Sequence, residues 1–211
     1  MSTELYKDYW KLRQSNDTLF GYGLKRRTTE LLSVIRHHQL PTARVLDMGC
    51  ADGAMVAAVR AAFTVQEAIG IDIFEPGLPP AIDGVSFIQH DLYKHYPYPC
   101  ADGSVDLIIV SAFYKHHPQQ AKFLEELRRI LAPGGAIVFL EPRRWVVRLG
   151  SLLGYFNPRY CPHPWTPRSL AMQLPKGLGM GAVDNYWLAP TPSLLWIEKL
   201  TPNWLRQIVG L

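Results

Sequence analysis

The sequence has few of the features that hold a chain together covalently or fix it in a membrane. It contains three cysteines, Cys50, Cys100 and Cys161, an odd number without the paired spacing of a disulfide framework or a zinc site. No apolar run reaches the roughly 20 residues that span a bilayer. Residues 1–10 are polar and charged, unlike a signal peptide. These absences predict a protein of the reducing cytoplasm.

Acidic side chains are absent from one long stretch of the chain. No Asp or Glu occurs from Arg143 to Val183, where prolines and aromatic residues also concentrate. The basic residues of this stretch are Arg143, Arg144, Arg148, Arg159, Arg168 and Lys176. Over the whole chain the formal net charge is only +4. Scattered Lys and Arg side chains of this number are typical of a solvated surface, so no nucleic-acid partner is expected.

The remaining part of the chain alternates between two kinds of segment. Apolar runs that read as strands cover residues 44–48, 68–73, 85–91, 105–112 and 136–140. Helical patterns cover residues 1–40, 54–63 and 119–131. The alternation predicts an α/β fold, with a doubly wound, mostly parallel sheet covered by helices on both faces. One more strand at 183–188, and at 194–200 either a strand or the helix that we favour, would make six or seven strands.

Residues 45–53 contain the strongest local signal, which reads as strand, tight turn and start of a helix. Gly49 and Gly53 let a ligand approach the backbone closely, and the helix from Ala54 offers N–H groups that have no partner within it. Asp47 lies at the end of the strand, where it would repel a phosphate group. The turn is therefore suited to a nucleoside with a neutral or cationic tail rather than to a triphosphate.

The small residues of this turn also fit a second interpretation. Gly49, Ala51 and Ala54 form a glycine-poor version of the dinucleotide fingerprint, and Asp72 follows about 20 residues later, as a ribose-binding acid would. An NAD-dependent oxidoreductase is therefore one alternative. Against it, the chain lacks a Tyr-x-x-x-Lys pair and the usual glycine spacing. Asp47 before the turn and Asp91 at the end of the third predicted strand also point elsewhere.

Five stretches, in this order and spacing, resemble the class I S-adenosylmethionine-dependent methyltransferases that act on small molecules. They are residues 45–53, 70–73, 90–92, 105–108 and 127–135, the last of which ends in Pro133-Gly134-Gly135 before the fifth predicted strand. The resemblance implies a Rossmann-like fold with S-adenosyl-L-methionine as the cofactor. It also implies a single methyltransferase domain over residues 1–211. We divide this domain into a helical cap at 1–40, a cofactor-binding core at 41–142, and an acceptor-binding or lid region with an amphipathic tail at 143–211.

The resemblance implies roles for individual residues of the core. The turn at 49–53 would lie under the methionine part of the cofactor, whose ammonium group Asp47 would orient. Asp72 would accept hydrogen bonds from both ribose hydroxyls, a task that suits a carboxylate. Asp91 would accept from the adenine amino group, and Leu92 would pack on the adenine opposite Ile73. The predicted cofactor-binding residues are Asp47, Gly49, Cys50, Ala51, Gly53, Asp72, Ile73, Asp91, Leu92 and Ser111, and no metal is expected.

Within the turn, one residue departs from the family pattern and two others have simpler structural interpretations. Ala51 stands where the family often has glycine, and alanine is small enough to replace it. Cys50 is interpreted as a packed loop residue rather than as a nucleophile. The adjacent Asp52 is interpreted as a cap of the next helix.

Candidate catalytic residues follow the fourth predicted strand. Methyl transfer from a sulfonium is an in-line displacement, for which the protein supplies alignment and a dry pocket. A hydroxyl acceptor would also have to lose a proton, and a neutral histidine can accept one near pH 7. His116 and His117 are therefore predicted as candidate general bases. The alternative that either histidine only packs or caps a helix stays open, as does the choice among oxygen, nitrogen and carbon as the methylated atom.

We expect the region at 143–211 to select the acceptor. Its arginines alternate with aromatic and aliphatic side chains, which fits either a lid over the sheet, as we favour, or a surface for anionic lipid or substrate. Trp196, Leu200 and Trp204 lie four residues apart, as in an amphipathic helix. We predict a small-molecule or lipid-linked acceptor, and leave open a peripheral membrane contact through 143–160 and 192–211. A non-catalytic cofactor-binding partner subunit is a further alternative.

Overall fold

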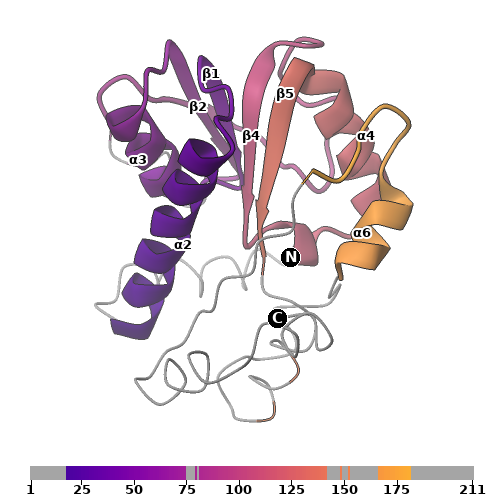
Figure 1. Cartoon of the computed structure of the whole chain (residues 1–211), viewed down its shortest axis with the longest axis horizontal. Helices are drawn as coiled ribbons and strands as arrows, with labels where there is room; N and C mark the ends of the chain where they lie inside the picture. Colours follow the sequence, from indigo (N-terminus) through magenta and orange to yellow (C-terminus); the bar gives the residue numbers. More distant parts are fainter. Residues whose placement is uncertain are drawn as a thin grey trace.

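The computed structural model describes residues 18–74, 79, 81–141, 148, 152 and 166–181. Within these residues strands and helices alternate along the chain (Figure 1). In chain order the elements are α2 (Thr18–His37), β1 (Arg44–Met48), α3 (Ala54–Ala62), β2 (Glu67–Asp72), β3 (Ser86–Gln89), β4 (Val105–Ser111), the 3₁₀ turn η1 (Tyr114–His116), α4 (Gln120–Ile130), β5 (Leu131–Leu140) and α6 (Pro167–Gln173).

The five described strands form one sheet in the order β3-β2-β1-β4-β5, and every neighbouring pair is parallel. The chain winds outward from β1 through β2 to β3, and then from β4 to β5 on the other side. The order therefore reverses between β1 and β4, which is where ligands bind in open parallel sheets. The predicted doubly wound parallel sheet is confirmed. The further strands expected at 183–188 and 194–200 lie outside the described residues.

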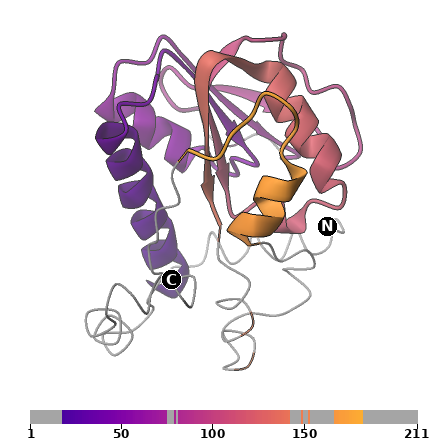
Figure 2. The same ribbon diagram turned by 45° about the vertical axis from the view of Figure 1, so that its right-hand side comes forward.

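Helices cover both faces of the sheet, α2 and α3 on one face and α4 and α6 on the other (Figures 1 and 2). Successive residues of the central strands point to opposite faces, so each strand serves both cores. Val45 and Leu107 pack toward α2 and α3, whereas Leu46 and Ile108 belong to the core beside α4. Both faces of these strands are buried, which explains why most of their residues are apolar.

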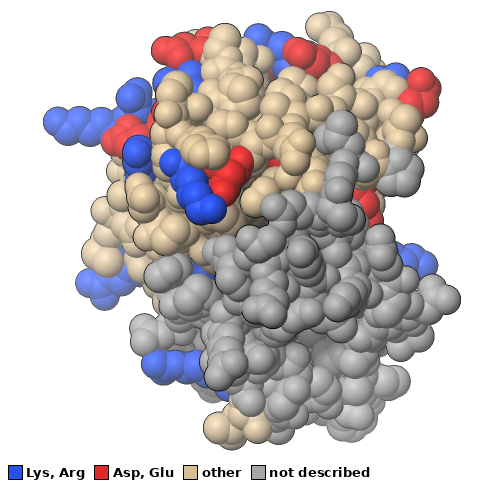
Figure 3. Space-filling view, turned by 180° about the vertical axis from the view of Figure 1, so that it is seen from behind, with Lys and Arg blue, Asp and Glu red and all other residues tan. Residues whose placement is uncertain are grey.

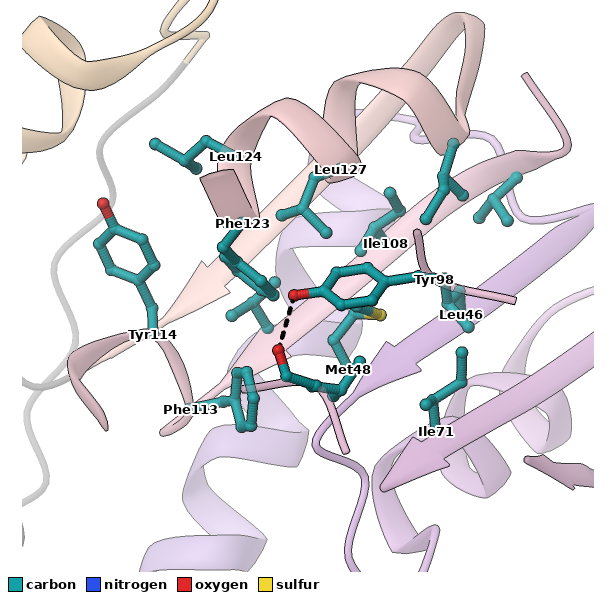
Figure 4. Packing of buried hydrophobic residues seen from close by; sticks show 14 of the residues in the cluster. Leu46, Met48, Ile71, Tyr98, Ile108, Phe113, Tyr114, Phe123, Leu124 and Leu127 are labelled. Carbon is teal, nitrogen blue, oxygen red and sulfur yellow. Dashed lines mark hydrogen bonds between the residues drawn. The ribbon is translucent and has the colours of Figure 1, made fainter. Parts of the chain in front are cut away.

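The helices match their apolar patterns. In α2, Leu31 and Ile35 lie one turn apart and are fully buried against the sheet. In α4 the buried face consists of Phe123, Leu124, Leu127 and Ile130 (Figure 4). Residues 1–17 of the predicted helical cap lie outside the described part of the chain. None of the described helices is long and apolar enough to cross a membrane.

The predicted start of the fifth strand is wrong. The segment Pro133-Gly134-Gly135 was expected to precede a strand at 136–140, but β5 already begins at Leu131 and contains these residues. Leu131 pairs with Val105, and the pairing shifts register before Leu107 meets Ala136. This irregularity accommodates a proline and a left-handed glycine within the strand, since Gly134 has φ +78°. The other boundaries differ from the prediction by a few residues at most.

Candidate cofactor site

Three of the predicted acids lie at the same edge of the sheet. Asp47 is near the end of β1, Asp72 ends β2, and Asp91 follows β3. Because these strands are parallel neighbours, their carboxyl ends meet. Asp47 and Asp72 are only 2% and 7% exposed. A buried carboxylate needs hydrogen-bond partners to stay charged, so these residues must be held by the surrounding structure.

Asp72 is tied to the turn that follows β1. Its Oδ2 accepts a hydrogen bond from the Ala51 N–H at 2.8 Å, and its Oδ1 accepts from the Ile73 N–H at 2.7 Å. The N–H groups of Gly49 and Cys50 donate to the carbonyl of Ile71 at 2.8 and 3.2 Å. The turn after β1 is thus fixed against the end of β2, and a carboxylate retains lone pairs with which to accept from a ligand hydroxyl.

The shape of this turn depends on two glycines. Gly49 and Gly53 have φ of +74° and +75°, which is the left-handed region where a Cβ is unfavourable. A Cβ on Gly49 would lie 2.3 Å from the ring of Phe113, and one on Gly53 would lie 2.6 Å from the ring of Phe87. The turn between them contains Ala51, whose φ of 51° is also left-handed. The backbone of this turn is therefore tightly packed from both sides.

Cys50 is a packed loop residue, as expected, whereas the N-cap position of α3 is Gly53 and not Asp52. Burial raises the pKa of the Cys50 thiol, and the charges of Asp47, Asp72 and Asp52 raise it further. The thiolate that a nucleophile requires is thus disfavoured. Asp52 accepts a hydrogen bond at 3.1 Å from the N–H of Ala54, the first residue of α3.

The three residues expected to bind adenine differ in their burial and in their contacts. Asp91 accepts from the Tyr93 N–H at 3.0 Å and forms an ion pair at 3.2 Å with the exposed Lys94. Ile73, directly after β2, is half-buried. The Leu92 side chain is 3% exposed and belongs to the core beside α4. This position favours a contact with adenine through Ile73 and through the backbone of Leu92 more than through the Leu92 side chain.

The structure separates the two histidines that follow β4. His117 is fully buried and stacks on Phe123 with ring centroids 4.8 Å apart. Its Nδ1 accepts from the Gln119 N–H at 3.1 Å, so in the neutral ring Nε2 carries the proton and donates to the Leu92 carbonyl at 3.0 Å. This environment favours a structural role for His117. His116 lies on η1 and is half-buried, which makes it the better placed of the two candidate bases.

A buried acid after β5 is part of the same edge and was not anticipated from the sequence. Glu141 accepts hydrogen bonds from the N–H groups of Phe113 and Tyr114 and from Nζ of Lys115. These residues directly follow Ser111 and Ala112 at the end of β4. A signal for Glu141 was present, because it follows an apolar strand directly, as Asp72 closes β2.

A parallel α/β sheet with a glycine turn after β1 and acids at the ends of neighbouring strands defines a nucleoside-binding protein of the class I methyltransferase fold. The chain belongs to the methyltransferase domain family, whose model matches residues 19–179. The predicted resemblance and S-adenosylmethionine as the cofactor are thereby confirmed. The NAD-dependent alternative is set aside.

Comparison with individual proteins agrees with this assignment. The chain is 34% identical over 124 residues to malonyl-[acyl-carrier protein] O-methyltransferase of Methylococcus capsulatus, a match that covers 56% of this chain and 44% of that protein. It is 27% identical over 169 residues to trans-aconitate 2-methyltransferase of an Azoarcus species, covering 79% of this chain and 58% of the relative. The chain therefore spans about half the length of these curated relatives.

Solved structures share the fold. The YcgJ protein of Bacillus subtilis matches 70% of this chain and 65% of its own, with a TM-score of 0.54 and 19% identity. The plantazolicin methyltransferase BpumL, in complex with a monoazolic desmethylPZN analog and S-adenosylhomocysteine (SAH), matches 73% of this chain and 59% of its own, with a TM-score of 0.54 and 17% identity.

Proposed function

We propose that this protein transfers a methyl group from S-adenosylmethionine to a small-molecule or lipid-linked acceptor. The observation that carries the proposal is the set of acids at the carboxyl ends of β1, β2 and β3 beside the turn at 49–53. Asp47 binds the ammonium group of the cofactor, Asp72 its ribose hydroxyls and Asp91 its adenine. Gly49, Cys50, Ala51, Gly53, Ile73, Leu92 and Ser111 supply the surrounding backbone and walls.

Among such acceptors we favour an acidic molecule, free or attached to a carrier. The stretch from Arg143 to Val183 is rich in arginine and free of acids, so it suits an anionic partner. Two relatives carry names that point the same way, since malonyl and aconitate groups both contain carboxylates. On the face of the molecule in Figure 3, the described residues show charges of both signs interspersed, unlike the basic surface of a nucleic-acid-binding protein.

The acceptor decides whether a base is needed. A carboxylate is already ionised near pH 7 and can attack the methyl group without losing a proton. A hydroxyl acceptor would need a base, and we assign that role to His116 before His117. The cytoplasm remains the predicted location, and the segments expected to contact a membrane, 143–160 and 192–211, lie largely outside the described residues.

Isothermal titration calorimetry with S-adenosylmethionine, SAH and NAD tests the cofactor assignment. We expect heat with both sulfur nucleosides and none with NAD. Heat with NAD alone would contradict the proposed function. Binding of the sulfur nucleosides without turnover of any acceptor would instead support the non-catalytic alternative.

Methyl-labelled S-adenosylmethionine tests the acceptor class. The enzyme is incubated with dicarboxylic acids, their carrier-bound thioesters, phenols and lipid-linked alcohols. We expect label in a base-labile methyl ester, formed at a rate that is flat above about pH 5. Label in a base-stable ether, at a rate that falls in His116→Gln but not in His37→Gln at the exposed end of α2, would instead establish a hydroxyl acceptor with His116 as base.

A further inference from the structure

Glu141 is a buried charge whose partners within the described part of the chain lie in the turn after β4. Its side chain is fully buried and that of Lys115 is 7% exposed, with 3.2 Å between Oε2 and Nζ. Its Oε1 accepts from the N–H groups of Phe113 and Tyr114 at 2.5 and 2.6 Å. Hydrogen bonds to a charged acceptor are the strong ones, so this carboxylate fixes three consecutive residues.

The turn that Glu141 holds has a strained conformation. Ala112 has φ +54°, in the left-handed region that an L-residue adopts at a cost. Phe113 follows with right-handed dihedrals, and its N–H and that of Tyr114 converge on one oxygen. A left-handed residue followed by a right-handed one forms a concavity of N–H groups that binds anions. In this protein the anion is the carboxylate of Glu141.

Held in this conformation, the turn at 112–114 places the ring of Phe113 against the turn at 49–53. The Phe113 ring lies so close to Gly49 that a Cβ there would be 2.3 Å from its Cδ2. The same ring stacks on Tyr93 with centroids 5.2 Å apart, and the Tyr93 N–H donates to Asp91. Figure 4 shows Phe113 and Tyr114 on the turn beyond β4, at the edge of the core that contains Phe123. Phe113 therefore contacts segments from both parts of the proposed site.

We propose that Glu141 is a positioning residue of the cofactor site, which holds the turn at 112–114 so that Phe113 supports the backbone at Gly49. This inference rests on the proposed assignment of the turn at 49–53 to the cofactor. The length of the Glu141 side chain is the essential property, because its carboxylate must extend from the end of β5 to the backbone N–H groups beyond β4. The charge of Glu141 matters only together with that of Lys115.

Two variants separate the effect of the length of the Glu141 side chain from the effect of its charge. Glu141→Asp keeps the charge but shortens the side chain by one methylene, so it cannot serve Lys115 and both amides together. The double variant Glu141→Gln with Lys115→Met keeps the length and an oxygen acceptor and removes both charges. Asp106→Asn is the matched control, since Asp106 pairs with Arg44 near the opposite end of β4.

Calorimetric titration with SAH, with urea unfolding of each variant, is the measurement. We expect Glu141→Asp to weaken SAH binding about tenfold and the double variant to stay within about threefold of wild type. The control should lose stability with unchanged affinity. Amide exchange in residues 111–116 should accelerate in Glu141→Asp and slow again when SAH is added.

The outcomes discriminate between the two proposals. Wild-type protein without affinity for SAH would remove the proposed function itself. Wild-type affinity in Glu141→Asp, or a weaker double variant than Glu141→Asp, would overturn the positioning role and leave the cofactor site intact. After either result with the Glu141 variants, Glu141 would be only a buried charge partner of Lys115.

Discussion

The two ends of the sheet hold their acids in different ways. Near the amino ends of the strands, Asp106 is bound by Arg44 through both carboxylate oxygens, at 2.7 and 2.9 Å from guanidinium nitrogens. There too, Arg129 joins Glu126 and Asp102 and donates to the carbonyls of Tyr98 and Cys100. At the carboxyl ends, Asp72 and Asp91 accept from the backbone N–H groups of Ala51 and Tyr93. The cations paired with acids there, among the described residues, are lysines, Lys94 on Asp91 and Lys115 on Glu141, each of which reaches one carboxylate oxygen at 3.2 Å.

The difference separates acids that stabilise the fold from acids that can serve a ligand. A guanidinium that binds both oxygens of a carboxylate neutralises it and occupies its strongest directions. Backbone amides orient a carboxylate and leave it charged, with lone pairs for hydroxyl or ammonium donors. Acids are present at both ends of the sheet. The kind of donor, which depends on the fold, distinguishes the structural end from the functional one.

The largest effect should come from Gly49→Ala, compared with Gly134→Ala near the other end of the sheet. Both glycines are left-handed, with φ of +74° and +78°, but a Cβ would meet Phe113 at Gly49 and nothing within 4 Å at Gly134. We expect the free energy of unfolding to fall by about 2–4 kcal/mol for Gly49→Ala and by about 1 kcal/mol for Gly134→Ala. Urea denaturation measures both, and equal losses would mean that Phe113 yields easily.

Asp72→Ala should weaken SAH binding by more than tenfold. The change removes a buried carboxylate that we assign to the ribose hydroxyls, and it also releases the N–H of Ala51. Asp72→Asn keeps one oxygen acceptor and should lie between the variant and the wild type. Calorimetric dissociation constants provide the measurement. An unchanged constant in Asp72→Ala would refute the ribose assignment.

Asp106→Asn should alter the dependence of stability on pH and leave SAH affinity unchanged. The hydrogen bond from Arg44 holds the pKa of Asp106 below its usual value, against the opposing effect of burial. A depressed folded-state pKa contributes stability above the unfolded-state value of about 3.9, and this stability is lost as the pH falls through the folded-state pKa. Wild type should therefore lose more stability than Asp106→Asn between pH 7 and pH 3 in urea titrations. Parallel curves would contradict the role of the ion pair.

The smallest expected effect is a difference in thiol reactivity between Cys50, at the carboxyl ends of the strands, and Cys100, beside Arg129 near the amino ends. Burial is the main cause that raises the thiol pKa of both Cys50 and Cys100, but acids raise that of Cys50 further whereas Arg129 lowers that of Cys100. Since the thiolate is the reactive form, iodoacetamide at pH 8 should alkylate Cys100 before Cys50. Peptide mass spectrometry gives the order of modification. Faster labelling of Cys50 would mean that the turn opens or that its thiol is ionised.

The elements at the centre of the sheet could be predicted because their signals are local. An apolar run with an acid at or near its end indicated where β1 and β2 finish, and parallel pairing then placed Asp47 and Asp72 at one edge. The start of β5 could not be predicted, because it depends on how Leu131 pairs with Val105 on another strand. Neither could the difference between the histidines, since the contacts of His117 come from Leu92 and Phe123. Glu141 was overlooked because its partners lie 26 to 28 residues earlier in the chain.

The reversal of strand order also has a mechanical meaning. The pairing of β1 with β4 joins two halves that wind in opposite directions, β1-β2-β3 and β4-β5. A cofactor that contacts the turn after β1 and Ser111 at the end of β4 would bridge this seam. It would then act as a clamp on the two halves as well as a methyl donor.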